Sequence, residues 1–186
     1  MIPDVPAGIR LLGITGAPGA GKSTLAARLG LPVVPMDGFH YADVELARRG
    51  LLERKGAPDT FDAEGYAVLL GRVRRGESDV VAPAFERDLE QPIAGALWIP
   101  PRGTIVTEGN YLLLEEPRWR AVREQLDEVW HVEADESTRL ERLVARHVRF
   151  GKTPEQARAW VERVDQPNAT LVEAARQRAD RIVRVG

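Results

Sequence analysis

The stretch Gly16-Ala17-Pro18-Gly19-Ala20-Gly21-Lys22-Ser23-Thr24 decides how the rest of this chain is interpreted. It fits the pattern G-x-x-x-x-G-K-[S/T], which is typical of loops that bind the phosphates of a nucleotide. The apolar run 9–15 directly precedes it and is expected to form a buried strand, and the run 23–29 directly after it favours a helix. Because strand, loop and helix stand in the order that such a loop requires, we predict a triphosphate site rather than an ordinary glycine-rich turn.

The chemistry of a triphosphate explains why these residue types occur in this order. Many backbone donors must curve tightly around the phosphates, and glycines permit both the close approach and the positive φ angles of that curve. The helix that follows directs its unpaired N–H groups and its positive dipole end at the anion. Lys22 is expected to reach the β- and γ-phosphates, and the Ser23 hydroxyl is expected to bind Mg²⁺. All nine residues, 16–24, therefore form the predicted phosphate-binding set.

Length and composition exclude several other classes of protein. A chain of 186 residues is expected to form one domain, 1–186, with a substantial core. The formal net charge of −2 provides no basic surface for nucleic acid, and the absence of cysteine excludes disulfides and a thiolate nucleophile. No apolar run is long enough for a membrane span and residues 1–4 lack signal-peptide character, so we expect a cytoplasmic protein without a membrane partner.

Strand-forming and helix-forming runs alternate along most of the chain. This alternation argues for an α/β fold, with a parallel sheet covered by helices on both faces. Ligands of such sheets bind outside the carboxyl ends of the strands. The expected strands are 9–15, 31–36, 80–85, 94–99, 104–107, 128–132 and 181–185, of which 80–85 and 94–99 form a hairpin. The expected helices are 23–29, 44–49, 64–75 with Asp62 as its N-cap, 117–125, 136–150, 154–164 and 169–179.

Two carboxylates follow the carboxyl ends of predicted strands. Glu108 ends the strand 104–107, a position from which an acidic side chain commonly meets the metal-bound water beside a phosphate-binding loop, although aspartate is more usual there. Asp37 follows the strand 31–36 and could accept the proton of a substrate hydroxyl that attacks the γ-phosphorus. The alternatives are a turn-capping carboxylate at each position. A plain loop histidine is the alternative for His40, which could otherwise bind substrate.

The predicted helix 136–150 carries Arg139, Arg142, Arg146 and Arg149 in one narrow stripe, with its leucines and valines on the other side. Such arginines stabilise charge that develops on a transferred phosphoryl group. We therefore predict that residues 139–153 form a lid over the phosphates. A solvated helix face is the alternative, and it is the interpretation we adopt for Arg139.

With these residues assembled, the chain resembles the phosphoribulokinase/uridine kinase family, and several stretches also resemble type I pantothenate kinase. The resemblance covers nearly the whole length. It is carried by the phosphate loop and by the stretches Met36-Asp37-Gly38-Phe39-His40, Arg54-Lys55-Gly56-Ala57-Pro58, Thr60-Phe61-Asp62, Ala82-Pro83-Ala84-Phe85, Val106-Thr107-Glu108-Gly109-Asn110-Tyr111-Leu112-Leu113 and Arg178-Ala179-Asp180.

The resemblance implies a P-loop NTPase fold, three layers α/β/α with a five-stranded parallel sheet in the order 2-3-1-4-5, and a small hairpin, about 80–99, over the acceptor site. It implies ATP and Mg²⁺ as cofactors and a monomer or homodimer. It also implies that Asp37, Lys22 and Arg146 are catalytic, that Ser23 and Glu108 hold the metal, and that Arg142, Asn168 and Arg178 contact the nucleotide. The implied acceptor pocket consists of Phe39, His40, Lys55, Phe85, Glu86, Arg87 and Tyr111.

The residues at the hairpin set the expected substrate apart from those of the relatives. Pantothenate kinase-like sequences have Tyr-x-His where this chain has Phe85-Glu86-Arg87, and the uridine kinase-like Tyr-Asp-Phe pattern is absent. Arg87 could bind a phosphate or carboxylate of the acceptor, and Glu86 could pair with sugar hydroxyls. We therefore expect an ATP-dependent kinase that phosphorylates a hydroxyl of a small metabolite, such as a sugar, a nucleoside or a pantothenate-like alcohol. The rival hypothesis is a nucleotide-hydrolysing switch that acts on a protein partner.

Overall fold

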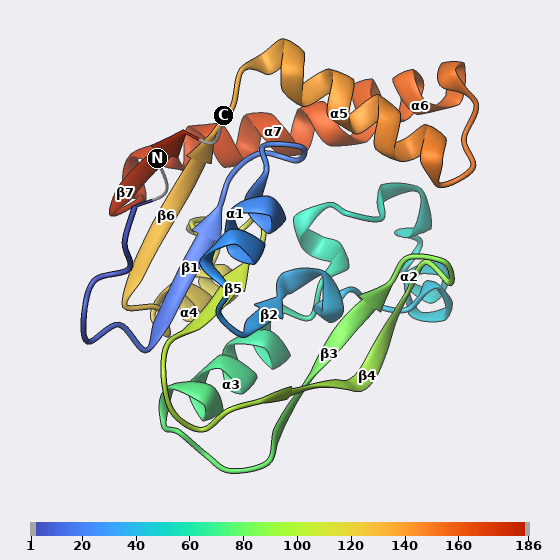
Figure 1. Ribbon diagram of the computed structural model, residues 1–186. Helices are drawn as coiled ribbons and strands as arrows, with labels where there is room; N and C mark the ends of the chain where they lie inside the picture. The colour runs from blue at the N-terminus through green and yellow to red at the C-terminus, as the bar shows by residue number, and fades with distance from the viewer. Residues whose placement is uncertain (1–2, 185–186) are drawn as a thin grey trace.

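The computed structural model describes residues 3–184 and shows alternating strands and helices (Figure 1). The strands are β1 (Leu11–Thr15), β2 (Val33–Pro35), β3 (Val80–Glu86), β4 (Gln91–Ile99), β5 (Ile105–Glu108), β6 (Glu128–Glu133) and β7 (Arg181–Arg184). The helices are α1 (Lys22–Leu29), α2 (Asp43–Arg49), α3 (Ala63–Arg74), α4 (Pro117–Arg123), α5 (Glu136–Arg149), α6 (Pro154–Trp160) and α7 (Gln166–Ala174). Val185, the last residue of the expected final strand, lies outside the described residues.

Five strands form a parallel sheet in the order β2-β5-β1-β6-β7. With the two hairpin strands set apart, this is the order 2-3-1-4-5, so the predicted sheet is confirmed. Strand β1 lies at the centre between β5 and β6, and every one of its residues is buried. The phosphate loop therefore leaves the middle of the sheet, at the edge where the carboxyl ends of the strands meet.

Alternate residues of the strands supply two separate cores, one on each face of the sheet. Leu11 and Ile105 point to the face that packs against α3, α4 and α7, and their neighbours Leu12 and Val106 point to the face covered by α1. Side chains that alternate in this way require apolar residues at consecutive positions, because both faces are covered. The continuous apolar runs of the sequence thus have the expected structural reason. Asp62 caps α3, as predicted, by accepting a hydrogen bond of 2.9 Å from the Gly65 amide.

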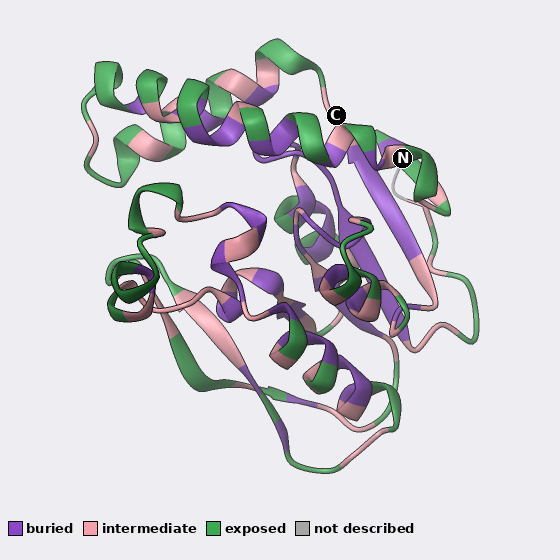
Figure 2. Ribbon diagram, turned by 180° about the vertical axis from the view of Figure 1, so that it is seen from behind, coloured by how far each residue is buried: buried purple, intermediate pink, exposed green. Residues whose placement is uncertain are grey.

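The antiparallel hairpin β3–β4 stands apart from the main sheet, and much of it is exposed (Figure 2). Its backbone lies on the turn Met36–Phe39 that follows β2. A Cβ atom at Gly38 would overlap the Pro83 carbonyl group, so only glycine allows the two segments to approach this closely. Because Gly38 allows this approach, the preceding residue, Asp37, lies directly beside the hairpin.

The C-terminal helices differ from the prediction of two helices separated at residues 165–168. Helix α6 continues through a π-helical turn, Val161–Asp165, directly into α7. Pro167 stands in the first turn of α7, where its missing N–H costs no intrahelical bond, so the chain stays helical past it. The wider π-helical turn also leaves Asp165 buried, and such turns occur frequently at functional sites.

Among residues 3–184, no helix is long and apolar enough to cross a membrane.

Candidate active site

The phosphate loop has the shape that its glycines predict. Gly16, Gly19 and Gly21 all adopt positive φ, at 149°, 81° and 101°. At Gly19 an added Cβ would come within 2.8 Å of the Leu143 side chain and 2.9 Å of the Arg139 carbonyl oxygen, so α5 packs tightly on the outside of the loop. The loop is thereby held between the sheet and α5, with the first turn of α1 behind it.

The Lys22 side chain is buried and folds back onto its own loop. Its Nζ donates hydrogen bonds to the carbonyl oxygens of Gly16, at 2.8 Å, and Ala17, at 3.1 Å. Burial lowers the pKa of Lys22 from 10.5 to about 8, although the negative charges of Glu108 and Asp37 act against that change. The lysine and both carboxylates therefore lie within electrostatic reach of one another, at the edge where the sequence places them.

Ser23 and Glu108 form a pair of oxygen ligands next to the lysine. The Ser23 hydroxyl donates to Glu108 Oε1 at 3.0 Å. Burial, and then the charge of Asp37, raise the pKa of Glu108, while Lys22 opposes them. A divalent cation would relieve this carboxylate repulsion, and oxygen ligands are the kind that Mg²⁺ prefers. Between residues 3 and 184 no group of three or more acidic, histidine or cysteine side chains is placed to hold a metal.

Asp37 is half-buried and forms an ion pair across the gap to the hairpin. Its Oδ2 accepts a hydrogen bond of 2.6 Å from Arg87 Nη2. Burial alone would raise the pKa of Asp37, but the charges of His40 and Arg87, together with the Arg87 hydrogen bond, outweigh burial and lower it. Asp37 is therefore held ionised, as a proton acceptor must be, with one oxygen already occupied.

His40 lies between the Asp37 turn and the hairpin. Its ring centroid is 3.9 Å from that of Phe61 and 5.0 Å from that of Phe85, and its Nδ1 lies 2.8 Å from the Asp37 carbonyl oxygen. Because a carbonyl oxygen only accepts, Nδ1 carries the proton of this bond. Burial lowers the pKa of His40 against the opposing charge of Asp37, which favours the neutral ring. In the neutral ring the Nε2 lone pair can accept from a substrate hydroxyl.

Lys55 closes the other side of this region. Its Nζ lies 5.4 Å from the centre of the Phe85 ring and 2.6 Å from Asp43 Oδ1, and it also donates to the Glu90 carbonyl oxygen in the hairpin turn. The region around Asp37 is thus lined by two residues of the hairpin and two of the facing loops, namely Phe85, Arg87, His40 and Lys55. Glu86 lies nearby in the exposed end of the hairpin, where its carboxylate accepts from the Asp88 amide.

Four other predicted site residues pack or form hydrogen bonds within the protein around the site. Phe39 packs in the core against Tyr66, with ring centroids 4.6 Å apart. Tyr111 is fully buried, and both its hydroxyl and the Asn168 amide donate to the Gly56 carbonyl oxygen, which anchors the loop that carries Lys55. Arg178 donates to the Leu113 carbonyl oxygen at 2.9 Å. In this conformation these side chains pack against or hydrogen-bond to the segments that carry the site. Their contact with substrate or nucleotide stays a prediction.

One arginine of the predicted lid, Arg146, lies near an aspartate that sequence reasoning missed. Asp165 Oδ2 lies 2.8 Å from His147 Nε2, and its Oδ1 lies 3.9 Å from Arg146 Nη2. Arg142 reaches toward the phosphate loop, since its Nη1 lies 3.8 Å from where a Cβ of Gly21 would be. Only the π-helical turn brings Asp165 inward, and no local pattern in the sequence announces that turn.

Arg139 corrects the expectation of a solvated side chain. It is 6% exposed, and its guanidinium donates to the Pro18 carbonyl oxygen at 3.2 Å and to Gln166 Oε1. The reason is the close packing of α5 on the loop at Gly19, which turns the first part of the arginine stripe inward. Arg139 therefore ties the phosphate loop to α7.

We expect replacement of Arg139 by methionine to lower the free energy of unfolding by about 2 kcal/mol, because the buried Pro18 carbonyl oxygen and the partly buried Gln166 side-chain oxygen lose a cationic donor. ATP binding should weaken as well, since the Pro18 carbonyl loses its anchor. Chemical denaturation and nucleotide titration measure the two effects. Arg158→Met, at an exposed position in α6, is the matched control. An Arg139→Met protein as stable as the control would contradict this role.

Together, the sheet order, the phosphate loop at its centre and the carboxylates beside the loop define the class as a P-loop kinase. No protein-family model matches the sequence. "Putative uridine kinase C227.14" of Schizosaccharomyces pombe is 33% identical over 182 residues, which cover 88% of this chain and 77% of the relative. A pantothenate kinase of Limosilactobacillus reuteri is 31% identical over 138 residues, covering 67% of this chain and 45% of the relative.

A solved structure agrees with these relatives. The crystal structure of a "putative fructose transport system kinase" from Silicibacter sp. TM1040 superimposes with a TM-score of 0.84 at 41% identity, covering 96% of this chain and 91% of that one. The chain belongs to the phosphoribulokinase/uridine kinase family of P-loop kinases. It is an ATP-dependent phosphotransferase with an alcohol group as acceptor, and that acceptor is a small molecule.

Proposed function

We propose that this kinase transfers the γ-phosphate of Mg-ATP to a hydroxyl of a small polar metabolite bound between Asp37 and the end of the β3–β4 hairpin. The acceptor classes that the proposal admits are sugars, nucleosides and pantothenate-like alcohols. The observation that carries it is the position of the Asp37 carboxylate, within electrostatic reach of Lys22 and Glu108 and beside the aromatic and basic residues of the hairpin. A proton acceptor, a phosphate-binding lysine and a magnesium-side acid thus share one edge of the sheet.

In the proposed reaction, the acceptor oxygen forms a bond to the γ-phosphorus as the bond from that phosphorus to the β–γ bridging oxygen breaks and ADP leaves. The hydroxyl proton passes to an oxygen of Asp37. Lys22 holds the β- and γ-phosphates, and Arg142 and Arg146 approach the same phosphates from α5. Ser23 and Glu108 would hold Mg²⁺, which neutralises part of the phosphate charge when bound.

The relatives support a small alcohol without deciding which one. Their names include a uridine kinase, a pantothenate kinase and a fructose transport system kinase. The stretch Phe85-Glu86-Arg87 matches neither the pantothenate kinase-like nor the uridine kinase-like pattern, so a sugar or a related polyol stays among the candidates. A single copy of the chain carries every residue that the proposal uses, and the proposal holds for a monomer and for a homodimer.

A panel of acceptors tests this proposal. Purified protein with Mg-ATP is offered sugars, nucleosides and vitamin-precursor alcohols, ADP release is recorded, and the phosphorylated product is identified by mass spectrometry. We expect at least one acceptor to raise ADP release well above the acceptor-free rate and to gain one phosphate. Hydrolysis that ignores every small acceptor and rises with a protein partner would favour the rival, a regulatory nucleotide switch.

A further inference from the structure

Arg87 holds one of the two carboxylate oxygens of the proposed base. It lies in the turn between the last paired residues of the hairpin, Glu86 and Gln91, and its Nη2 is 2.6 Å from Asp37 Oδ2. Its guanidinium also stacks on Phe85, with 5.0 Å between the guanidinium carbon and the ring centre. A carboxylate oxygen that accepts a charge-assisted hydrogen bond is a weaker base, and a guanidinium at that place also stands where the acceptor hydroxyl must come.

The neighbouring charges show what could release Asp37. Lys55, the other cation at the hairpin, is already held by Asp43 and by the Glu90 carbonyl oxygen. Glu86 accepts from the Asp88 amide in the same turn. Arg87 therefore has Asp37 as its carboxylate partner among the described residues, and its side chain is 44% exposed. An acceptor without charge would have to displace Arg87 and leave it no partner in exchange.

We propose that Arg87 is a specificity-determining latch: it masks Asp37 in the empty site and transfers to a carboxylate or phosphate of the acceptor, so that the enzyme selects hydroxyl compounds with an anionic group. This inference rests on the proposed function and names its substrate class. The exchange replaces one charge-assisted hydrogen bond by another, and it frees Asp37 only when an anion is present. Water does not supply that anion, so the latch also limits ATP hydrolysis in the absence of an acceptor.

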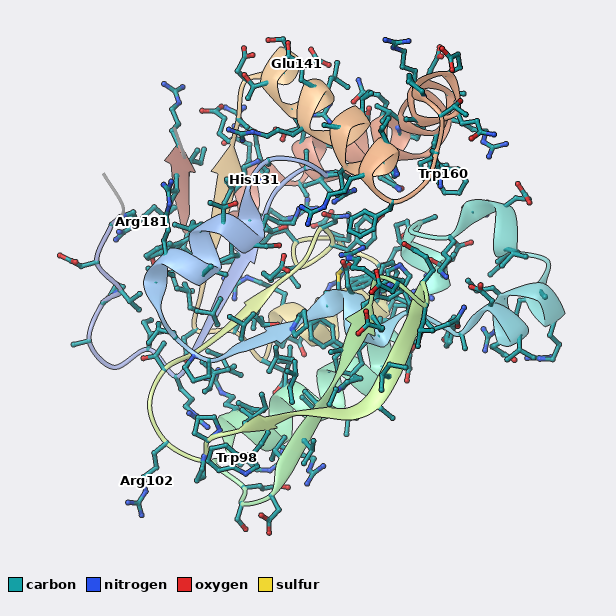
Figure 3. The ribbon with its side chains drawn as sticks, turned by 45° about the vertical axis from the view of Figure 1, so that its right-hand side comes forward. Trp98, Arg102, His131, Glu141, Trp160 and Arg181 are labelled. Atoms are coloured by element: carbon teal, nitrogen blue, oxygen red, sulfur yellow. The ribbon has the colours of Figure 1, made fainter. Side chains whose placement is uncertain are left out.

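Binding measurements test the latch without relying on turnover. Pantothenate and pantothenol differ by a carboxylate, and ribose 5-phosphate and ribose differ by a phosphate, so the two pairs distinguish the two anions. Calorimetric titration with each compound is made on the wild type, Arg87→Gln, Arg87→Lys and Asp37→Asn. Arg102→Gln is the control, since Arg102 is exposed beyond the base of the hairpin, at the end where Trp98 lies and away from the turn (Figure 3).

The expected signs differ for the two partners of the ion pair. Arg87→Gln should weaken binding of the anionic member of one pair by about tenfold, and Arg87→Lys should restore part of that loss. Asp37→Asn should instead strengthen the same binding by about fivefold, because Arg87 no longer has a charged partner to leave. Arg87→Gln should not weaken binding of the neutral members, and the Arg102→Gln control should show neither change. Equal effects of Arg87→Gln on the anionic and neutral members of both pairs would overturn the proposal.

Turnover separates a failure of the latch from a failure of the proposed function. In Arg87→Gln, ATP hydrolysis without acceptor should rise several-fold, and neutral acceptors should gain relative to anionic ones. If the wild type phosphorylates a neutral acceptor in an Asp37-dependent manner and Arg87→Gln changes neither hydrolysis nor selectivity, the latch is wrong and the kinase reaction stands. If no acceptor of either kind is phosphorylated, the proposed function falls and the latch falls with it.

Discussion

Replacement of Asp37 by asparagine should lower kcat for the phosphorylated acceptor by about 10²–10⁴-fold, because the amide cannot accept the hydroxyl proton. The affinity for ATP should stay nearly unchanged, since the phosphates are held by the loop at residues 16–24 and not by this side chain. Asparagine has nearly the shape of aspartate, and kcat measured at saturating acceptor separates the loss of proton transfer from the change in acceptor binding that follows when the ion pair with Arg87 is lost. Steady-state kinetics and titration with a fluorescent ATP analogue measure the two quantities separately.

Asp79→Asn is the matched control for this result, because Asp79 is exposed directly before β3, at the end of the hairpin opposite the turn that carries Arg87, and the substitution removes the same charge. That variant should keep the kinetics of the wild type. An Asp37→Asn protein that retains more than about a tenth of the wild-type kcat would show that another group takes the proton, since general-base catalysis contributes at least about a hundredfold.

Replacement of Lys22 by methionine should have two effects of opposite sign. Phosphoryl transfer should fall by about 10²–10³-fold, because one cationic donor to the transferred group is lost. Burial of the charged lysine costs the nucleotide-free protein up to about 3 kcal/mol, the free energy that corresponds to a fall of the pKa from 10.5 to about 8. The substitution should recover the part of this free energy that exceeds the loss of the Nζ hydrogen bonds to Gly16 and Ala17. Chemical denaturation at pH 7, without nucleotide, measures this gain.

The pH dependence of stability checks the cause of that gain. Burial lowers the pKa of Lys22 in the folded protein below its value in the unfolded chain, so between about pH 8 and 10.5 the unfolded chain binds more protons. The destabilisation is therefore fully present below pH 8 and is lost as the pH rises toward 10.5. Wild-type stability should increase over this range relative to Lys22→Met. Parallel stability profiles for the two proteins would contradict the burial of a charged lysine.

Local patterns in the sequence predicted most of the strands and helices, and the phosphate loop. The loop is built from consecutive residues whose glycines set its backbone angles, so strand, loop and helix follow from one short stretch. The N-cap at Asp62 and the continuous apolar runs of a sheet covered on both faces are likewise local features. The order of the strands came from the resemblance to a kinase family, because no local pattern states which strands are neighbours.

Tertiary structure alone decided how side chains far apart in the sequence meet. The ion pair of Arg87 with Asp37 joins residues that are 50 positions apart, and it depends on the approach of the hairpin to Gly38. Arg139 was predicted to be solvated and is buried, because the periodicity of a helix shows that it has two faces but not which neighbour covers each one. Asp165 reaches His147 only through a π-helical turn. The sequence by itself therefore determined the nucleotide chemistry of this protein, which is local, whereas the acceptor side arises from long-range packing.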